Sequence, residues 1–202
     1  LRNCRKNLCT FIKYRQTTKF VVDGVMIPIS ATTLQIPIDL FVSNKHPDLG
    51  DSLVAITDSS NKILFRVSQA KRTNRLLICY ASGSTLFSIH RRNDSSWLCS
   101  RDNEEEILFL ITSTKKSILA REMEVFLGGN GGSKPDFKLV GFAHQRSCTI
   151  LKGDSIIAET SLMYKLHEIF KICGRSKFRL TIFPGNVDGA LLVSFLAVFF
   201  YG

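Results

Sequence analysis

The stretch that decides the fold is the end of the chain, NVDGALLVSFLAVFFYG, residues 186–202. A Pro-Gly pair breaks the chain just before it, so Asn186 is expected to cap a helix, with the carboxylate of Asp188 in the first turn. Between residues 190 and 201 the polar side chains are the hydroxyl of Ser194 and a terminal tyrosine phenol. Such a helix has no polar face and must be enclosed on all sides.

Lipid or protein can enclose this helix. Twelve apolar residues span about 18 Å, whereas the hydrocarbon core of a bilayer is about 30 Å thick. No basic residue follows to anchor a spanning segment. We therefore expect a helix threaded through the body of the protein, and a short tail anchor is the alternative.

The sequence before this helix is typical of short strands joined by tight turns. Turn residues such as Asp58-Ser59-Ser60-Asn61 and Ala81-Ser82-Gly83-Ser84 separate segments of alternating apolar and polar residues. The expected strands are residues 38–42, 52–57, 62–67, 75–80, 85–91, 97–100, 106–112, 118–127, 137–142, 148–151, 155–159 and 177–183. Residues 118–127 also fit a helix, and residues 161–172 are a second helical candidate.

About twelve strands at this spacing predict a mainly β, closed antiparallel barrel, because closure removes exposed strand edges. A large barrel has a lumen, and an all-apolar helix can fill it. The side chains of Leu192, Phe195, Leu196 and Phe199 are then expected to pack against Phe65, Phe87, Phe109 and Ile182.

Charge divides the chain into two parts. Residues 1–22 hold six of the 27 basic residues and no acid, which leaves 21 basic and 17 acidic residues and a net charge of +4 for the rest. We expect a flexible basic leader at 1–22 and one barrel domain at 23–202. The leader lacks the apolar run of a secretory signal, and a transit peptide is an alternative. A cytoplasmic location is therefore expected, with reduced thiols.

No motif in the sequence supports catalysis or a metal. The six cysteines form no CxxC pair, and the four histidines do not stand at metal-ligand spacing from them. Residues 128–134, GGNGGSK, lack the GK[ST] ending of a phosphate loop. The acidic run 104–106 is expected to be a solvated turn. We predict a protein that is not an enzyme and carries no cofactor.

Four segments carry a family resemblance: PIDLFVS at 37–43, DSSNKILFRV at 58–67, RSCTI at 146–150 and FRLTIFPGNVD at 178–188. The chain resembles the plant LURP-one-related family over about residues 30–202. The resemblance implies the tubby-like architecture, a twelve-stranded barrel around a C-terminal helix, with distant similarity to phospholipid scramblases. It also implies a link to plant defence and a binding or regulatory role.

Members of the tubby-like superfamily bind phosphoinositide headgroups through basic side chains, so we sought such residues at hairpin ends. The candidate headgroup site is Arg66, Lys71, Arg72, Arg75, Arg91 and Arg92. Anionic phospholipids at the inner surface of the plasma membrane are the expected partner. A solvated basic loop and a lipid-independent protein scaffold in defence signalling are alternatives. Nucleic acid and scramblase activity are less favoured, since neither a DNA-reading element nor a spanning helix is present.

Overall fold

The computed structural model describes residues 19–22, 25–28, 36–70, 73, 75–93, 95–101, 106–116, 120–129, 132, 134–163, 177–185 and 187–202. Of the predicted site residues, Lys71 and Arg72 lie outside this part of the chain, as does most of the helical candidate 161–172. Residues 161 and 162 belong to a strand.

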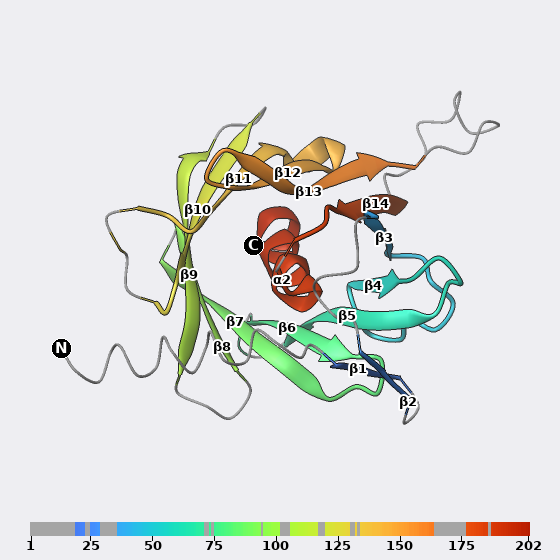
Figure 1. Ribbon diagram of the computed structural model, residues 1–202. Helices are drawn as coiled ribbons and strands as arrows, with labels where there is room; N and C mark the ends of the chain where they lie inside the picture. Colours follow the sequence, from blue (N-terminus) through green and yellow to red (C-terminus); the bar gives the residue numbers. More distant parts are fainter. Residues whose placement is uncertain are drawn as a thin grey trace.

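Twelve strands form a closed antiparallel barrel around one helix (Figure 1). In chain order they are β3 (Ile38–Ser43), β4 (Val54–Thr57), β5 (Ile63–Ala70), β6 (Arg75–Tyr80), β7 (Thr85–Asn93), β8 (Ser96–Arg101), β9 (Ile107–Lys116), β10 (Arg121–Leu127), β11 (Phe137–Phe142), β12 (Ser147–Lys152), β13 (Ser155–Leu162) and β14 (Lys177–Ile182). Each strand pairs with its neighbours in sequence, and β14 pairs with β3 to close the ring. The barrel and its strands are confirmed, and residues 121–127 are a strand rather than part of a helix.

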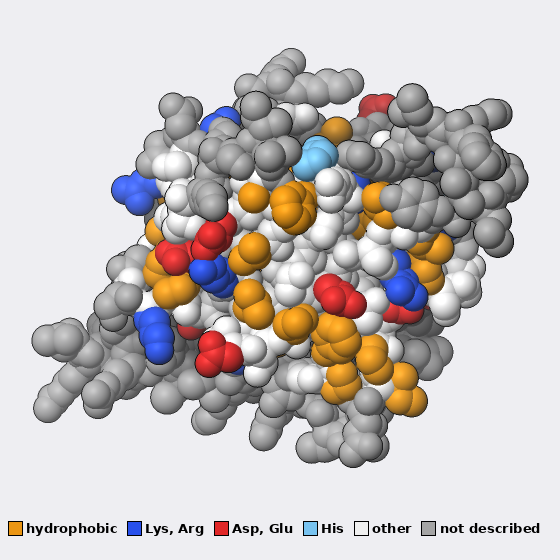
Figure 2. All heavy atoms as spheres, turned by 90° about the horizontal axis from the view of Figure 1, so that it is seen from above, with side chains coloured by type: hydrophobic (Ala, Val, Ile, Leu, Met, Phe, Trp, Pro, Cys, Tyr) orange, Lys and Arg blue, Asp and Glu red, His pale blue; other side chains and the backbone are white. Residues whose placement is uncertain are grey.

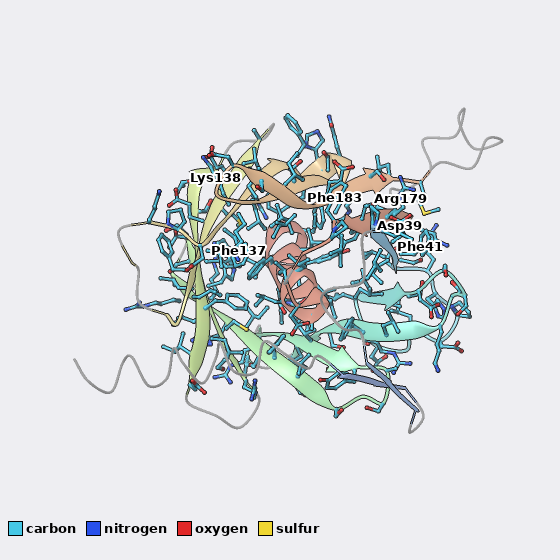
Figure 3. The ribbon with its side chains drawn as sticks, in the orientation of Figure 1. Asp39, Phe41, Phe137, Lys138, Arg179 and Phe183 are labelled. Atoms are coloured by element: carbon cyan, nitrogen blue, oxygen red, sulfur yellow. The ribbon has the colours of Figure 1, made fainter. Side chains whose placement is uncertain are left out.

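Alternation along each strand separates the core from the outer wall. In β11 the residues Phe137, Leu139 and Gly141 are buried, and those between them are more exposed. Figure 3 shows Phe137 on the side of the central helix and Lys138 on the outside. This period of two residues is what a barrel wall requires, because successive side chains point to opposite faces of a strand.

The helix α2 (Gly189–Tyr201) fills the barrel. Leu192, Phe195 and Phe199 have no exposed surface, and Leu196 is 4% exposed. The ring of Phe195 lies edge-on to Phe109 at 5.0 Å between centroids and 5.3 Å from Phe137. The threaded helix is therefore confirmed. No helix among the described residues has the length and apolar character needed to cross a bilayer.

The start of α2 differs from the sequence prediction in one detail. The N-cap is Asp188, whose side chain accepts a hydrogen bond of 2.9 Å from the N–H of Ala190, and Asn186 lies outside the described residues. Within the helix, the buried hydroxyl of Ser194 donates to the carbonyl oxygen of Ala190 at 2.8 Å. Every polar side chain of the helix interior thus has a partner, as burial requires.

The barrel is closed by polar contacts on its outer surface. Thr181 on β14 donates to Asp39 on β3 at 2.6 Å, and Arg179 forms an ion pair with the same carboxylate at 3.4 Å. Figure 3 shows Arg179 and Asp39 side by side across this seam. A separate hairpin, β1 (Lys19–Val22) with β2 (Val25–Pro28), spans the predicted boundary between leader and barrel domain.

Candidate functional site

The two ends of the barrel carry different charges. Because the strands run up and down in sequence order, successive connections lie at opposite ends. We call the end where α2 terminates the basic end. Its described strand termini and connections carry Arg75, Arg91, Arg92, Arg121, Arg146 and Lys177.

Acidic side chains are directed away from the basic end. Glu122 follows Arg121 in sequence, but it forms an ion pair with Lys138 on the outer wall. The β3–β4 connection, residues 44–53, leaves from the basic end but folds back, and its His46 contacts the Asn61 carbonyl oxygen in the opposite turn at 3.3 Å. Apart from that connection, we find no acid among the described residues of the basic end.

The opposite end of the barrel is close to neutral. Its described turns carry the acids Asp58, Glu106, Asp136, Asp154 and Asp188 and the bases Lys62, Arg101, Lys134 and Lys152. The fold therefore concentrates positive charge at one end, although the bulk of the sequence is only mildly basic. Such segregation creates a field that attracts anions to one face.

Arg121 is a half-buried cation of the basic end. It begins β10, points inward, and donates from Nη1 to the carbonyl oxygen of Phe199. Its guanidinium carbon lies 5.9 Å from the centre of the Phe199 ring. Burial lowers the pKa of Arg121, and the nearby charge of Arg91 lowers it further.

Arg146 covers the last turn of α2. Its guanidinium carbon lies 5.3 Å from the ring centre of Phe200 and 5.0 Å from that of Tyr201. The residue follows the short 3-10 helix η2 (Ala143–Gln145) and has a left-handed backbone, with φ 54° and ψ 31°. That conformation costs a residue with a Cβ about 1–2 kcal/mol. A glycine would avoid this cost, but it would have no side chain to place over the two rings.

Arg91 stands over the single tryptophan. Arg91 and Trp97 are register partners on β7 and β8, and the guanidinium carbon lies 5.6 Å from the indole ring centre. Trp97 is buried, and a Cβ added to Gly202 would lie 2.9 Å from its Nε1. Only a glycine at the end of α2 permits this approach. Arg91, Arg121 and Arg146 thus all lie around the C-terminal turn of one helix.

The structure distributes the predicted site residues unevenly. Arg75, Arg91 and Arg92 are exposed on the neighbouring strands β6 and β7 at the basic end. Burial and the charge of Arg75 lower the pKa of His90, which directly precedes Arg91 on β7. Arg66 lies farther along β5, where it donates to the carbonyl oxygens of Ala81 at 2.9 Å and Asp48 at 3.2 Å. Arg66 therefore braces two loops.

Sequence reasoning missed Arg121 and Arg146. Each is an isolated arginine near a strand terminus, far in sequence from the basic segment at 66–75. A signal was nevertheless available, because alternate connections of an up-and-down barrel share an end. Summing charges over alternate turns would have placed both arginines beside Arg91.

The described residues of the outer wall over β10–β13 show a mixture of charges rather than a concentration of one sign (Figure 2). Figure 2 looks onto the wall over β10–β13, where acidic and basic side chains lie interspersed among hydrophobic ones. The charges there include the ion pair between Lys138 and Glu122, and the exposed hydrophobic residues are Val140, Phe142 and Ile156. This surface is mixed rather than basic.

Chemical groups that could support metal binding or nucleophilic catalysis do not gather in the described part of the chain. No set of three His, Cys, Asp or Glu side chains there has metal-binding geometry. Burial raises the pKa values of the Cys99 and Cys148 thiols, so both stay protonated. A buried neutral thiol is a poor nucleophile.

Comparison with known proteins identifies the family. The family model described as LURP-one-related matches residues 38–200. The Arabidopsis thaliana protein LURP-one-related 7 is 39% identical over 171 residues, which cover 83% of this chain and 91% of that protein. The chain belongs to the LURP-one-related family.

A second LURP-one-related protein gives the same result at lower identity. LURP-one-related 10 of Arabidopsis thaliana is 29% identical over 175 residues, covering 80% of this chain and 88% of the relative. The crystal structure of another Arabidopsis thaliana protein superposes with a TM-score of 0.59 at 24% identity, covering 82% of this chain and 90% of that one. The latter match supports the fold alone.

Proposed function

We propose that this protein is a non-catalytic regulatory module that docks on anionic phospholipid headgroups through its basic end. The observation that carries the proposal is the segregation of charge between the two barrel ends. Six described bases lie at the end of the barrel where α2 terminates, whereas the opposite end is almost balanced. The module would act at the cytoplasmic surface of the plasma membrane, with a role in plant defence.

The expected binding free energy is compatible with reversible docking. Each basic residue near an anionic leaflet contributes about 1 kcal/mol at moderate salt, so six give about 6 kcal/mol before the cost of orienting the protein. The attraction acts within a Debye length of about 8 Å at physiological salt. Binding should therefore weaken steeply as salt rises.

The geometry also suits docking by one end. The arginines around α2 come from β7, from β10 and from the β11–β12 connection of a closed barrel, which holds their backbones in fixed positions. Arginine forks can make paired hydrogen bonds to phosphate oxygens, which a diffuse lysine-rich tail cannot do as well.

Vesicle pelleting with the full chain tests this proposal. We expect R75E/R92E to lose binding to vesicles containing an anionic phospholipid, because both side chains are exposed at the basic end. The matched control, K62E/K152E, makes the same change in net charge at the opposite end and should pellet like the unmodified protein. Both variants should keep the melting temperature, since exposed charges contribute little to stability.

The leader must be the same in every protein compared, because residues 1–22 hold six bases of their own. Equal pelleting of R75E/R92E and the control would show that the basic end does not dock on the membrane. Loss of binding by both variants would indicate attraction by net charge alone.

A protein-interaction scaffold is the second candidate function. Val140, Phe142 and Ile156 are 37%, 41% and 50% exposed on the outer wall of β11 and β13 (Figure 2). Exposed apolar groups of this kind are enriched where proteins meet. This role would be supported if V140K/I156K lost a stoichiometric protein partner that R75E/R92E retained.

A further inference from the structure

The connection from β3 to β4, residues 44–53, lies against the outer face of β5, and we call it the strap. Arg66 and Ser68 point outward from β5, because the residues on either side of Arg66 are buried in the core. Arg66 donates to the carbonyl oxygen of Asp48 at 3.2 Å. Ser68 donates to the hydroxyl oxygen of Ser52 at 2.9 Å. The strap is therefore held to the barrel wall at two points.

Both faces of β4 are buried. Val54 and Ile56 point inward, where they line a small apolar cavity of about 10 Å³ against α2. Ala55 and Thr57 therefore point outward, and yet they are only 0% and 2% exposed. Ala55 is the register partner of Arg66, so the strap that Arg66 holds lies beside it. The strap thus covers the outer face of β4.

The strand beneath the strap is held less firmly than its neighbours. β4 has four residues, whereas every other strand of the barrel has six or more. It pairs with β3 at three register positions, whereas β3 pairs with β14 at six. The cavity behind β4 also reduces its packing against α2. Release of the strap would therefore leave β4 easy to open locally.

His46 fastens the strap to the turn between β4 and β5. Its side chain is buried, and its Nδ1 accepts a hydrogen bond of 3.1 Å from the N–H of Asp48. An accepting Nδ1 carries no proton, so the proton of the neutral ring lies on Nε2, which donates to the Asn61 carbonyl oxygen at 3.3 Å. The side-chain amide of Asn61 also lies 3.2 Å from Nε2, so in this tautomer it turns its oxygen toward the ring. The closed strap uses the neutral imidazole.

The surroundings of the ring disfavour a second proton. The charged side chains on the strap, on β4 and β5 and on the turn between them are Lys45, Asp48, Asp51, Asp58, Lys62 and Arg66. The carboxylate of Asp48 comes to 3.9 Å from Nδ1, but this side chain is 77% exposed, so its attraction is screened. A proton on Nδ1 would face the N–H of Asp48 that now donates to it, and burial disfavours the charged ring.

We propose that the strap is an acid-sensitive cover of β4, which is released when His46 takes up a proton on Nδ1. Because the closed strap requires Nδ1 without a proton, a fall in pH favours the open form. Histidine ordinarily changes its charge between about pH 5 and 8, so mild acidity is sufficient. Opening exposes the outer face of β4 and leaves the rest of the barrel closed. The inference goes beyond membrane docking and does not depend on it.

Hydrogen exchange of the full chain at pH 7.5 and 5.5, followed by mass spectrometry and corrected for the intrinsic exchange rates, tests this proposal. We expect peptides from the strap and β4 to lose about tenfold in protection at pH 5.5, the usual effect of one lost hydrogen bond. Peptides from β10–β12 should keep their protection, because those strands lie outside the region that the strap covers.

His46→Asn separates the titration of the ring from its structural role. An asparagine can still accept from the N–H two residues further on, but it takes up no proton in this range. H46N should therefore protect the strap and β4 equally at both pH values. The matched control, H90Q, removes a histidine on β7 and should keep the pH response of the strap. S52A loses the hydrogen bond from Ser68, so it should lower protection of the strap at both pH values and keep the response.

Thermal melts at pH 7.5 establish that each variant is folded before exchange is compared. Equal protection of the strap and β4 at both pH values in the unmodified protein would overturn the proposal. A pH response that H46N retains would also overturn it, because another group would then be the sensor. An equal loss of protection in all strands at pH 5.5 would show global destabilisation by acid rather than a local cover.

Discussion

The two ends of α2 are held in different ways. Its first turn is capped by Asp188, the residue directly before the helix. Its last turn is held by Arg121 and Arg146, which reach it from the barrel wall, and Arg121 lies 78 positions from its acceptor, Phe199. One end is thus fixed by local sequence, and the other exists only once the barrel has closed.

This difference bears on function. A local cap stabilises the helix in any surroundings, and Asp188 contributes no positive charge to its end of the barrel. The remote arginines stabilise the helix and also leave charge at the barrel mouth. The end that depends on tertiary structure is therefore the one that we propose to dock on anionic headgroups.

A substitution in the middle of the helix is expected to change the free energy of unfolding more than a substitution at either end. Phe195 has no exposed surface and packs between Phe109 and Phe137. We expect F195A to lower the free energy of unfolding by about 3–5 kcal/mol, because the closed strands cannot collapse into the cavity. Urea denaturation followed by far-UV circular dichroism measures this change. A loss below about 1 kcal/mol would show that the strands adjust around α2.

The sequence predicted the parts of the fold that depend on local patterns. Turns such as Asp58–Asn61 and the alternation within β11 mark strands without knowledge of their partners. The unbroken apolar stretch of α2 required an enclosure, and a closed barrel was the structure able to provide one. These features depend on neighbours within a few residues, which is why they were accessible.

Details that depend on distant neighbours were less accessible. The N-cap was predicted at Asn186 and lies at Asp188. Either side chain can accept a hydrogen bond from a free helical N–H, so the sequence pattern alone does not distinguish them. Residues 118–127 fitted two periodicities until pairing with β9 and β11 made 121–127 a strand. Arg121 and Arg146 were missed because only barrel closure brings them to the last turn of α2.

The two helix ends can be compared directly by removing one cap at a time. We expect R121M to lower the free energy of unfolding by about 1.5–3 kcal/mol, since it leaves the buried Phe199 carbonyl oxygen without a charged donor. D188A should cost about 1 kcal/mol, the usual value for a lost N-cap, and D188N should be nearly neutral. Denaturation of all three variants in the same buffer tests the order.

A larger loss in D188A than in R121M would reverse the proposed contrast between a local and a tertiary helix end. Methionine keeps most of the apolar stem of arginine, so the R121M result reports on the guanidinium group rather than on packing. Arg121→Lys serves as the control, because its ammonium group can still donate to the carbonyl oxygen.

The smallest expected effect concerns His90 and acidity at the basic end. Burial and the charge of Arg75 lower the pKa of His90 below its ordinary value of 6.5 in the folded protein. The unfolded chain therefore takes up this proton first as the pH falls, and stability is lost below about pH 6.5. Unfolding midpoints of the unmodified protein and H90Q between pH 7.5 and 5.5 should diverge in this direction, with the unmodified protein losing more stability.

R75Q should reduce the divergence without removing it, because burial remains as the first cause of the shift. Parallel pH profiles for the unmodified protein and H90Q would show that positive charge at this end does not oppose a further proton.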